Sequence, residues 1–117
     1  MTQVFQKKVT IADSATLSPE VDLEGSQLVG IYVPAEFDGT GLGIQTAPTK
    51  DDNTRGTYVD VQNGAASSSA FAITTAASRY IPFDNLAITA GLRHIKLKAA
   101  TAQTGDTIFT LALRQVA

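Results

Sequence analysis

Apolar and polar residues alternate in short runs along most of the chain, and this two-residue period is typical of β-strands with one face on a core. The pattern is clearest at 93–99, where positions 95, 97 and 99 are apolar while 94, 96 and 98 are histidine or lysine. Runs bounded by turn residues recur at roughly the 8–12-residue spacing of sandwiches and barrels. They predict strands at 4–11, 28–33, 42–46, 57–61, 69–74, 79–83, 93–99 and 107–116, the last with Phe109, Leu111 and Leu113 on its core side.

Two segments depart from simple alternation. Residues 28–33 (LVGIYV) are continuously apolar, which predicts a strand buried on both faces that ends before the following proline. Residues 15–23 contain Pro19, which cannot donate to a central ladder. They therefore predict an edge segment or two very short strands.

The number and spacing of the runs predict a single all-β domain of about eight strands. Two architectures fit, an antiparallel two-sheet sandwich of jelly-roll type and a closed small barrel. The long polar connections at 48–56 and 62–68 favour the jelly roll, because its links cross between sheets while up-and-down barrels use tight hairpins. The first strand has two interpretations. Residues 1–11 either pair within their own domain or form an arm or exchanged strand that extends a neighbour's sheet.

Composition supports strands and narrows the function classes. The chain has 15 threonines but only 3 glutamates, whereas helices usually carry Glu, Lys and Gln on their exposed faces. With no cysteine, disulfides and thiolate metal sites are excluded. A net charge of −2 gives no electrostatic reason to expect nucleic-acid binding. No apolar run is long enough to span a membrane, and no apolar stretch after the two N-terminal lysines indicates a secretory signal.

The residues that carry chemistry form no catalytic or metal-binding pattern. His94 is the single histidine, it occupies an outward strand position, and we expect it to lie on a solvated face. The glycines at 39–43 precede an apolar strand and open no helix, which predicts a turn and not a phosphate loop. Asp51, Asp52 and Asn53 lack EF-hand spacing and predict a solvated loop. We expect no enzyme, cofactor or metal.

Two sets of side chains are candidates for recognition. Arg93, His94, Lys96, Lys98 and Arg114 form a potential basic stripe, which fits an acidic protein surface better than nucleic acid because no aromatic residues are interleaved. Three tyrosines, at positions 32, 58 and 80, are the side chains available to contact a sugar, although each lies within a strand run and is expected to be half-buried.

Six short stretches carry a resemblance to a known group of proteins. They are DLEG at 22–25, LVGI at 28–31, PAEF at 34–37, LGIQT at 42–46, LRHIKL at 92–97 and DTIF at 106–109. Together they resemble the cement or decoration proteins of tailed bacteriophage heads over roughly residues 15–115. The resemblance implies a jelly roll, and related jelly rolls include discoidin-like carbohydrate-binding modules. Phe37 stands where tryptophan is common in that pattern.

The resemblance implies a non-enzymatic protein on the capsid surface of a virion, with the major coat protein as partner and with itself as a homodimer or homotrimer. We expect no nucleic-acid or membrane partner. The alternative is a carbohydrate- or receptor-binding module of a phage fibre or appendage. A third interpretation is a small enzyme, which would need a polar pocket that the sequence does not show. The candidate interface residues are Val4, Phe5, Val9, Arg93, Lys96 and Lys98.

Overall fold

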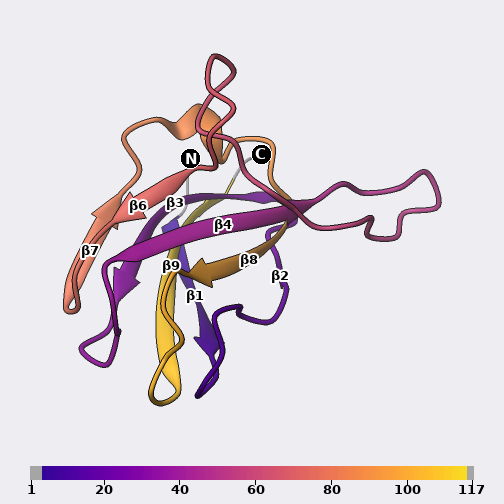
Figure 1. Cartoon of the computed structure of the whole chain (residues 1–117). Coiled ribbons are helices and arrows are strands. Elements are labelled where there is room, and N and C mark those ends of the chain that lie inside the picture. The colour runs from indigo at the N-terminus through magenta and orange to yellow at the C-terminus, as the bar shows by residue number, and fades with distance from the viewer. Residues whose placement is uncertain (1–3, 116–117) are drawn as a thin grey trace.

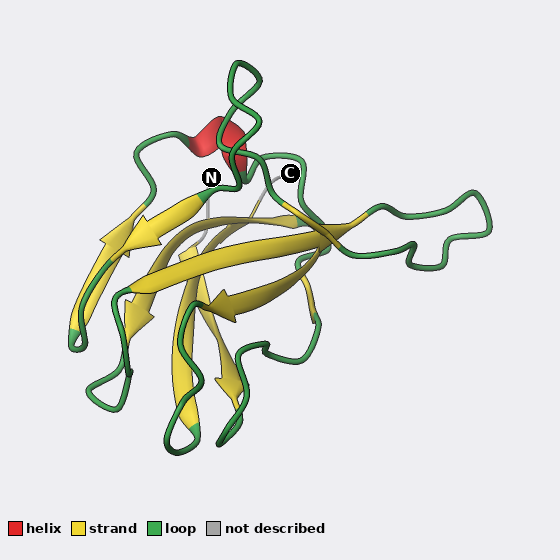
Figure 2. Cartoon of the chain, viewed as in Figure 1, coloured by secondary structure: helices red, strands yellow, loops and turns green. Residues whose placement is uncertain are grey.

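The computed structural model describes residues 4–115, which form nine β-strands and one short 3-10 helix (Figures 1 and 2). The strands are β1 (Val4–Ile11), β2 (Val21–Asp22), β3 (Ser26–Val33), β4 (Gly41–Ala47), β5 (Val59–Asp60), β6 (Ala72–Thr74), β7 (Arg79–Pro82), β8 (His94–Ala99) and β9 (Thr107–Gln115). The helix η1 (Leu86–Ile88) lies between β7 and β8. Within 4–115 no helix is long and apolar enough to cross a bilayer.

The strands form two antiparallel sheets. One has the order β1-β9-β3-β7, and the other has the order β2-β8-β4-β5, with β6 also paired to β4. Figure 1 shows β4 and β8 lying in front of β3, β9 and β1. The two long polar connections at 48–56 and 62–68 join β4, β5 and β6 within one sheet, so they do not cross as predicted. Every other connection crosses between the sheets, and the strand order is that of a jelly roll. The predicted antiparallel two-sheet sandwich of jelly-roll type is confirmed, and the closed-barrel alternative is wrong.

The core is the layer between the two sheets. Alternate side chains of each strand point into it, so β9 supplies Phe109, Leu111 and Leu113 while β8 supplies Ile95 and Leu97, all essentially inaccessible to solvent. Sheets packed face to face in this way form a continuous apolar layer. The register of β9 follows the pattern predicted from the sequence.

Most predicted strands are present, with shorter bounds around the middle of the chain. Predicted strand 4–11 matches β1, which pairs with β9 in its own domain. The predicted edge segment is the two-residue β2, preceded by an isolated bridge between Leu17 and Lys98. Predicted strand 57–61 is reduced to β5. The last predicted strand ends at Val116, which lies outside the described residues.

One prediction about the strands needs correction. The run 28–33 is not buried on both faces, because Tyr32 points outward from β3 and is 45% exposed. The strands at 69–74 and 79–83 lie in different sheets, because β6 joins β4 in one sheet while β7 joins β3 in the other. The connection between them therefore crosses the sandwich.

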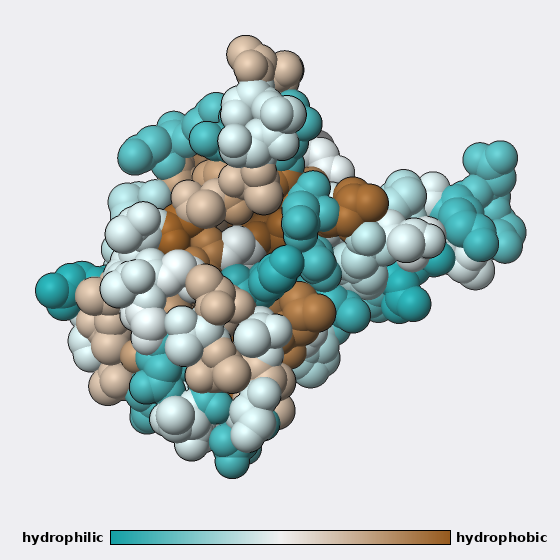
Figure 3. Space-filling model, viewed as in Figure 1, coloured by the Kyte–Doolittle hydropathy of each residue, from teal (hydrophilic) through white to brown (hydrophobic). Residues whose placement is uncertain are grey.

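The connection between β4 and β5 is a hydrophilic hairpin that projects from the body, on the right of Figures 1 and 3. A bridge joins Thr49 to Arg55, and the Lys50 amide donates to the Thr54 carbonyl at 2.7 Å. At the tip, the Asp52 carboxylate accepts hydrogen bonds from the amide and hydroxyl of Thr54, and Asn53 adopts a positive φ. The predicted solvated loop at 51–53 is therefore a structured turn.

Phe109 and Ile108 provide a matched test of the core. They are neighbours on β9, but Phe109 is fully buried and Ile108 is 50% exposed. We expect Phe109→Ala to lower the free energy of unfolding by about 3–5 kcal/mol, because it removes buried area and leaves a cavity. Ile108→Ala is the control, with an expected change within about 1 kcal/mol. Chemical denaturation measures both, and similar losses for the two variants would contradict the assigned register.

Candidate functional site

The two outer faces of the sandwich differ in charge, and each holds some of the predicted interface residues. On the five-stranded sheet, Lys96 and Lys98 of β8 point outward as predicted. The stripe is not a free basic surface, however. Arg93 Nε lies 3.2 Å from Asp22 Oδ1, and Lys98 Nζ lies 3.8 Å from Asp60 Oδ1. Lys96 Nζ lies 4.6 Å from the centroid of the Tyr58 ring.

Arg114 does not belong to this stripe. It lies on β9 in the four-stranded sheet, because the connection from β8 to β9 crosses the sandwich. Its Nη2 donates to Gln27 Oε1 at 2.6 Å, and Gln27 Nε2 donates to the Leu86 carbonyl at 3.0 Å. The Arg114 guanidinium is thereby held at one end of the outer face of that sheet.

His94 also differs from its predicted environment. It occupies the expected outward position but is only 7% exposed, so the prediction of a solvated histidine is wrong. The physical reason is that β8 is an inner strand between β2 and β4, and Glu20 lies beside the ring with Oε1 4.0 Å from Nδ1. Neither ring nitrogen has a hydrogen-bond partner among residues 4–115.

Glu20 fastens the projecting hairpin to the body. Its Oε1 accepts hydrogen bonds from the Tyr58 hydroxyl at 2.6 Å and from Arg55 Nη1 at 2.9 Å. These bonds lower the pKa of Glu20 below its usual value of 4.5. Burial, followed by the bond to Glu20, raises the pKa of the Tyr58 hydroxyl. Tyr58 is therefore held within the structure and is not a free platform for a sugar.

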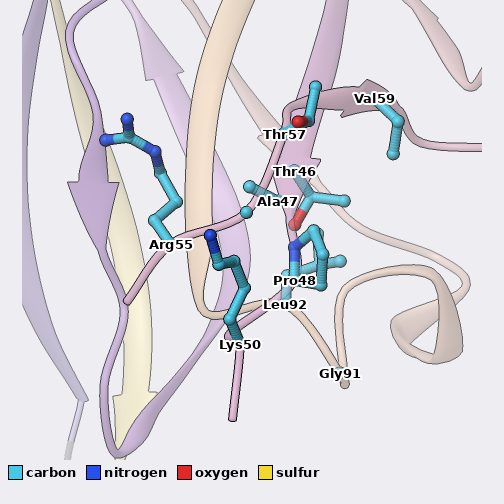
Figure 4. Close-up of a pocket in the computed structure, with 10 residues that line it drawn as sticks. Thr46, Ala47, Pro48, Lys50, Arg55, Thr57, Val59, Gly91 and Leu92 are labelled. Atoms are coloured by element: carbon cyan, nitrogen blue, oxygen red, sulfur yellow. The ribbon is translucent and has the colours of Figure 1, made fainter. Parts of the chain in front are cut away.

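A hollow of about 800 Å³ lies at the base of the hairpin (Figure 4). Ala47, Pro48 and Leu92 supply apolar surface, while Lys50 and Arg55 extend from the hairpin at one side. Arg55 is already bound to Glu20. The residues that line the hollow include no carboxylate and no histidine, so they provide no acid–base pair. Among all described residues, no cluster of histidine, cysteine and carboxylates is arranged to hold a metal ion.

The outer face of the four-stranded sheet has a different composition. No aspartate or glutamate occurs in β1, β3, β7 or β9, so all 11 acidic residues of the chain lie elsewhere. We call this surface the four-stranded face; its outward residues include Val4, Gln6, Lys8, Tyr32, Tyr80, Ile108, Thr110 and Arg114. Val4 is 68% exposed, and Ile108 and Tyr80 are exposed by 50% and 44%. Exposed apolar and aromatic side chains thus gather on a surface whose formal charges are positive.

Tyr32 and Tyr80 form an aromatic pair on this face. Their ring centroids are 4.6 Å apart and their planes are inclined by 47°. Tyr80 lies over Gly30, because a Cβ built at Gly30 would come within 2.1 Å of the Tyr80 hydroxyl oxygen. The glycine therefore lets one side of the Tyr80 ring rest on the sheet while the ring stays accessible from the other.

The predicted interface residues on β1 divide between surface and core. Val4 and Phe5 are exposed, but Val9 is only 5% exposed and points into the core opposite Phe109, so it is not available to a partner. Ile108 was not among the predicted interface residues, although the predicted core register of 107–116 places it on the outward side. It lies between the buried Thr107 and Phe109.

Comparisons with known proteins show no family. No family model matches the chain, and no curated protein does. Among solved structures, a chain reported under the words "Bacillus endospore appendages form a novel family of disulfide-linked pili" is similar, with a TM-score of 0.40 and 12% identity over 99% of this chain and 90% of that one. A likeness this low carries no argument about function.

The Glu20 contacts generate a prediction about pH. The folded-state pKa of Glu20 is below the unfolded value, so its contribution to stability is present above about pH 4.5 and is lost as the pH falls through the folded-state pKa. We expect Glu20→Gln to lower the free energy of unfolding at neutral pH by at most about 1 kcal/mol, because the pair is partly exposed. We also expect the variant to lose less stability than the wild type on acidification.

Denaturant titrations between neutral pH and about pH 3 measure this change. The matched control is Glu24→Gln, because the Glu24 side chain is 75% exposed and reaches Arg93 only at 3.8 Å. Equal pH profiles for the Glu20→Gln variant and the wild type would contradict the role assigned to Glu20.

Proposed function

We propose that this chain is a non-enzymatic decoration protein of a bacteriophage capsid, which binds the major coat protein on the outside of the head. One observation carries the proposal: the four-stranded face combines exposed Tyr32, Tyr80 and Ile108 with no acidic residue in any of its strands. Tyrosine, arginine and exposed apolar side chains are typical of the centre of protein interfaces. The resemblance of residues 15–115 to cement proteins supports the choice of partner.

The chemistry of the face also defines the surface it fits. Lys8 and Arg114 provide its positive charges, and in the described part of the chain neither forms an ion pair. An acidic patch on the coat protein is complementary to such a face. The small side chains Thr110 and Ala112 between the tyrosines and β1 allow close approach at little cost in side-chain entropy.

Binding of this kind stabilises a capsid by mass action. A protein that binds assembled coat subunits, and not dissociated ones, shifts the equilibrium toward the assembled shell. No covalent bond needs to form, and the stabilisation grows with the concentration of free decoration protein.

Co-sedimentation with purified expanded heads tests the proposal. We expect the wild-type protein to pellet with heads at micromolar concentration and Tyr80→Ala to bind about 30-fold more weakly, the effect of losing a 2 kcal/mol interface anchor. Ile108→Ala is expected to weaken binding in the same direction. Val59→Ala, an exposed apolar change on the other sheet, is the matched control and should bind like wild type. If the wild-type protein stays in the supernatant, the proposal fails.

The carbohydrate- or receptor-binding alternative has one observation in its favour. The accessible side of Tyr80, beside Tyr32, is a surface on which the apolar face of a sugar ring can stack. A glycan array tests it, with specific binding that disappears in Tyr80→Ala and persists in Val59→Ala as the supporting result. An array without any specific signal would reject this alternative and leave the coat-protein proposal unaffected.

A further inference from the structure

The outer edge of β1 is the one long open edge of the sandwich within residues 4–115. β1 has eight residues and pairs only with β9 among the described strands. The other edge strands have two to four residues each, and β7 also ends on Pro82, which cannot donate to an added strand. Natural proteins usually protect edges by keeping them short or by placing lysines on them. In β1 the lysines stand only at positions 7 and 8, so the exposed edge at 4–6 needs an explanation.

The first half of β1 is also left uncovered by the facing sheet. Phe5 and Lys7 share the register of the buried Val9 and Ile11, so their side chains point toward the interior side of the sheet. Phe5 is nevertheless 41% exposed, because the edge of the facing sheet is only the two-residue β2. The Lys7 side chain reaches that edge, and its Nζ donates a hydrogen bond to the Asp22 carbonyl oxygen at 3.2 Å. A core-facing aromatic ring is thus only partly covered by its own chain.

The space beside this edge is open. A groove of about 270 Å³ runs between β1 and the segment that contains β2, and Lys7, Lys8, Pro19 and Val21 help to line it. No described segment of the chain covers the edge of β1 at 4–8, where all five side chains are exposed. An additional strand therefore has access to the unpaired backbone groups.

We propose that the occupant of this edge is β1 of a second copy of the chain, paired antiparallel about Gln6. In this register Phe5 lies opposite Lys7 of the second copy, and Val4 lies opposite its Lys8. The alkyl stems of the lysines then cover the two exposed apolar side chains, and the two Phe5 rings become diagonal neighbours on one face. The exposed apolar end of each strand is covered by the basic end of the other.

Charge restricts the register in which two copies of β1 can pair. β1 carries two lysines and no acidic residue, so pairing in parallel register, or antiparallel about Lys7, places like charges directly opposite each other and is unfavourable. The antiparallel arrangement about Gln6 avoids every such contact. It is also isologous, and each copy uses its single long edge, so the assembly closes as a dimer with one continuous eight-stranded sheet. The proposal does not depend on the capsid function.

Cysteine cross-linking tests the register directly, because the natural chain has no cysteine. In the proposed dimer, position 6 meets itself with Cα atoms about 5 Å apart, within the range of a disulfide. We expect Gln6→Cys to form a covalent dimer on mild oxidation. Lys8→Cys, on the same face of the same strand, is the control; its two copies lie about 13 Å apart and should not link. Equal cross-linking of both variants would overturn the register.

Mass measurement of the protein in solution tests the dimer itself. Sedimentation equilibrium at about 1–100 µM should show a species of twice 12.3 kDa. We expect Phe5→Lys, which places lysine opposite Lys7 of the second copy, to raise the dissociation constant by at least about 10-fold. Phe5→Glu is the matched variant; it places opposite charges together and should retain the dimer at low salt.

Circular dichroism and thermal unfolding test whether both Phe5 variants keep the fold, as we expect because Phe5 is 41% exposed at an edge. A wild-type protein that remains at 12.3 kDa throughout, or that forms a trimer, would reject the proposal. An equal rise in the dissociation constant for Phe5→Lys and Phe5→Glu would also reject the proposal. Head binding by a protein that stays monomeric would reject the dimer and leave the proposed function standing.

Discussion

The burial of one apolar face from each sheet is the interaction on which the rest of this structure depends. Leu97 and Ile95 from one sheet, and Phe109 and Leu111 from the other, are inaccessible to solvent in the same core. The chain has no cysteine, so no disulfide joins the two layers. The sheets stay together because separating them exposes these side chains to water, at roughly 25 cal/mol for each Å² of apolar surface.

The same alternation that fills the core determines what the outside of each sheet presents. On the five-stranded sheet several outward residues are charged, and ion pairs such as those of Arg93 with Asp22 and Lys98 with Asp60 compensate much of this charge. On the four-stranded face the outward residues include two tyrosines, isoleucine, valine, threonine, glutamine and two cations, and none is acidic. The molecule therefore has one charge-compensated face and one apolar, positive face, and the second has the composition of a docking surface.

Both proposals use the four-stranded sheet, but they use different parts of it. Binding to a coat protein involves its outer face, around Tyr80 and Ile108, while association with a second copy involves the edge of β1. A dimer formed at that edge extends the sheet and places two such faces side by side, which favours attachment to a repetitive surface through two contacts at once. The hairpin fastened by Glu20 belongs to the other sheet, between β4 and β5.

The sequence by itself determined the fold class, the strand of residues 4–11 and the core register of β8 and β9, because alternation is a local property that a single strand already displays. It did not determine which strands become neighbours. Crossing connections placed Arg114 on the opposite sheet from Lys96, covered His94 beside Glu20, and turned Tyr32 and Tyr80 into an exposed pair over Gly30. These features depend on contacts between residues far apart in the chain, so only the packing of the two layers decided them.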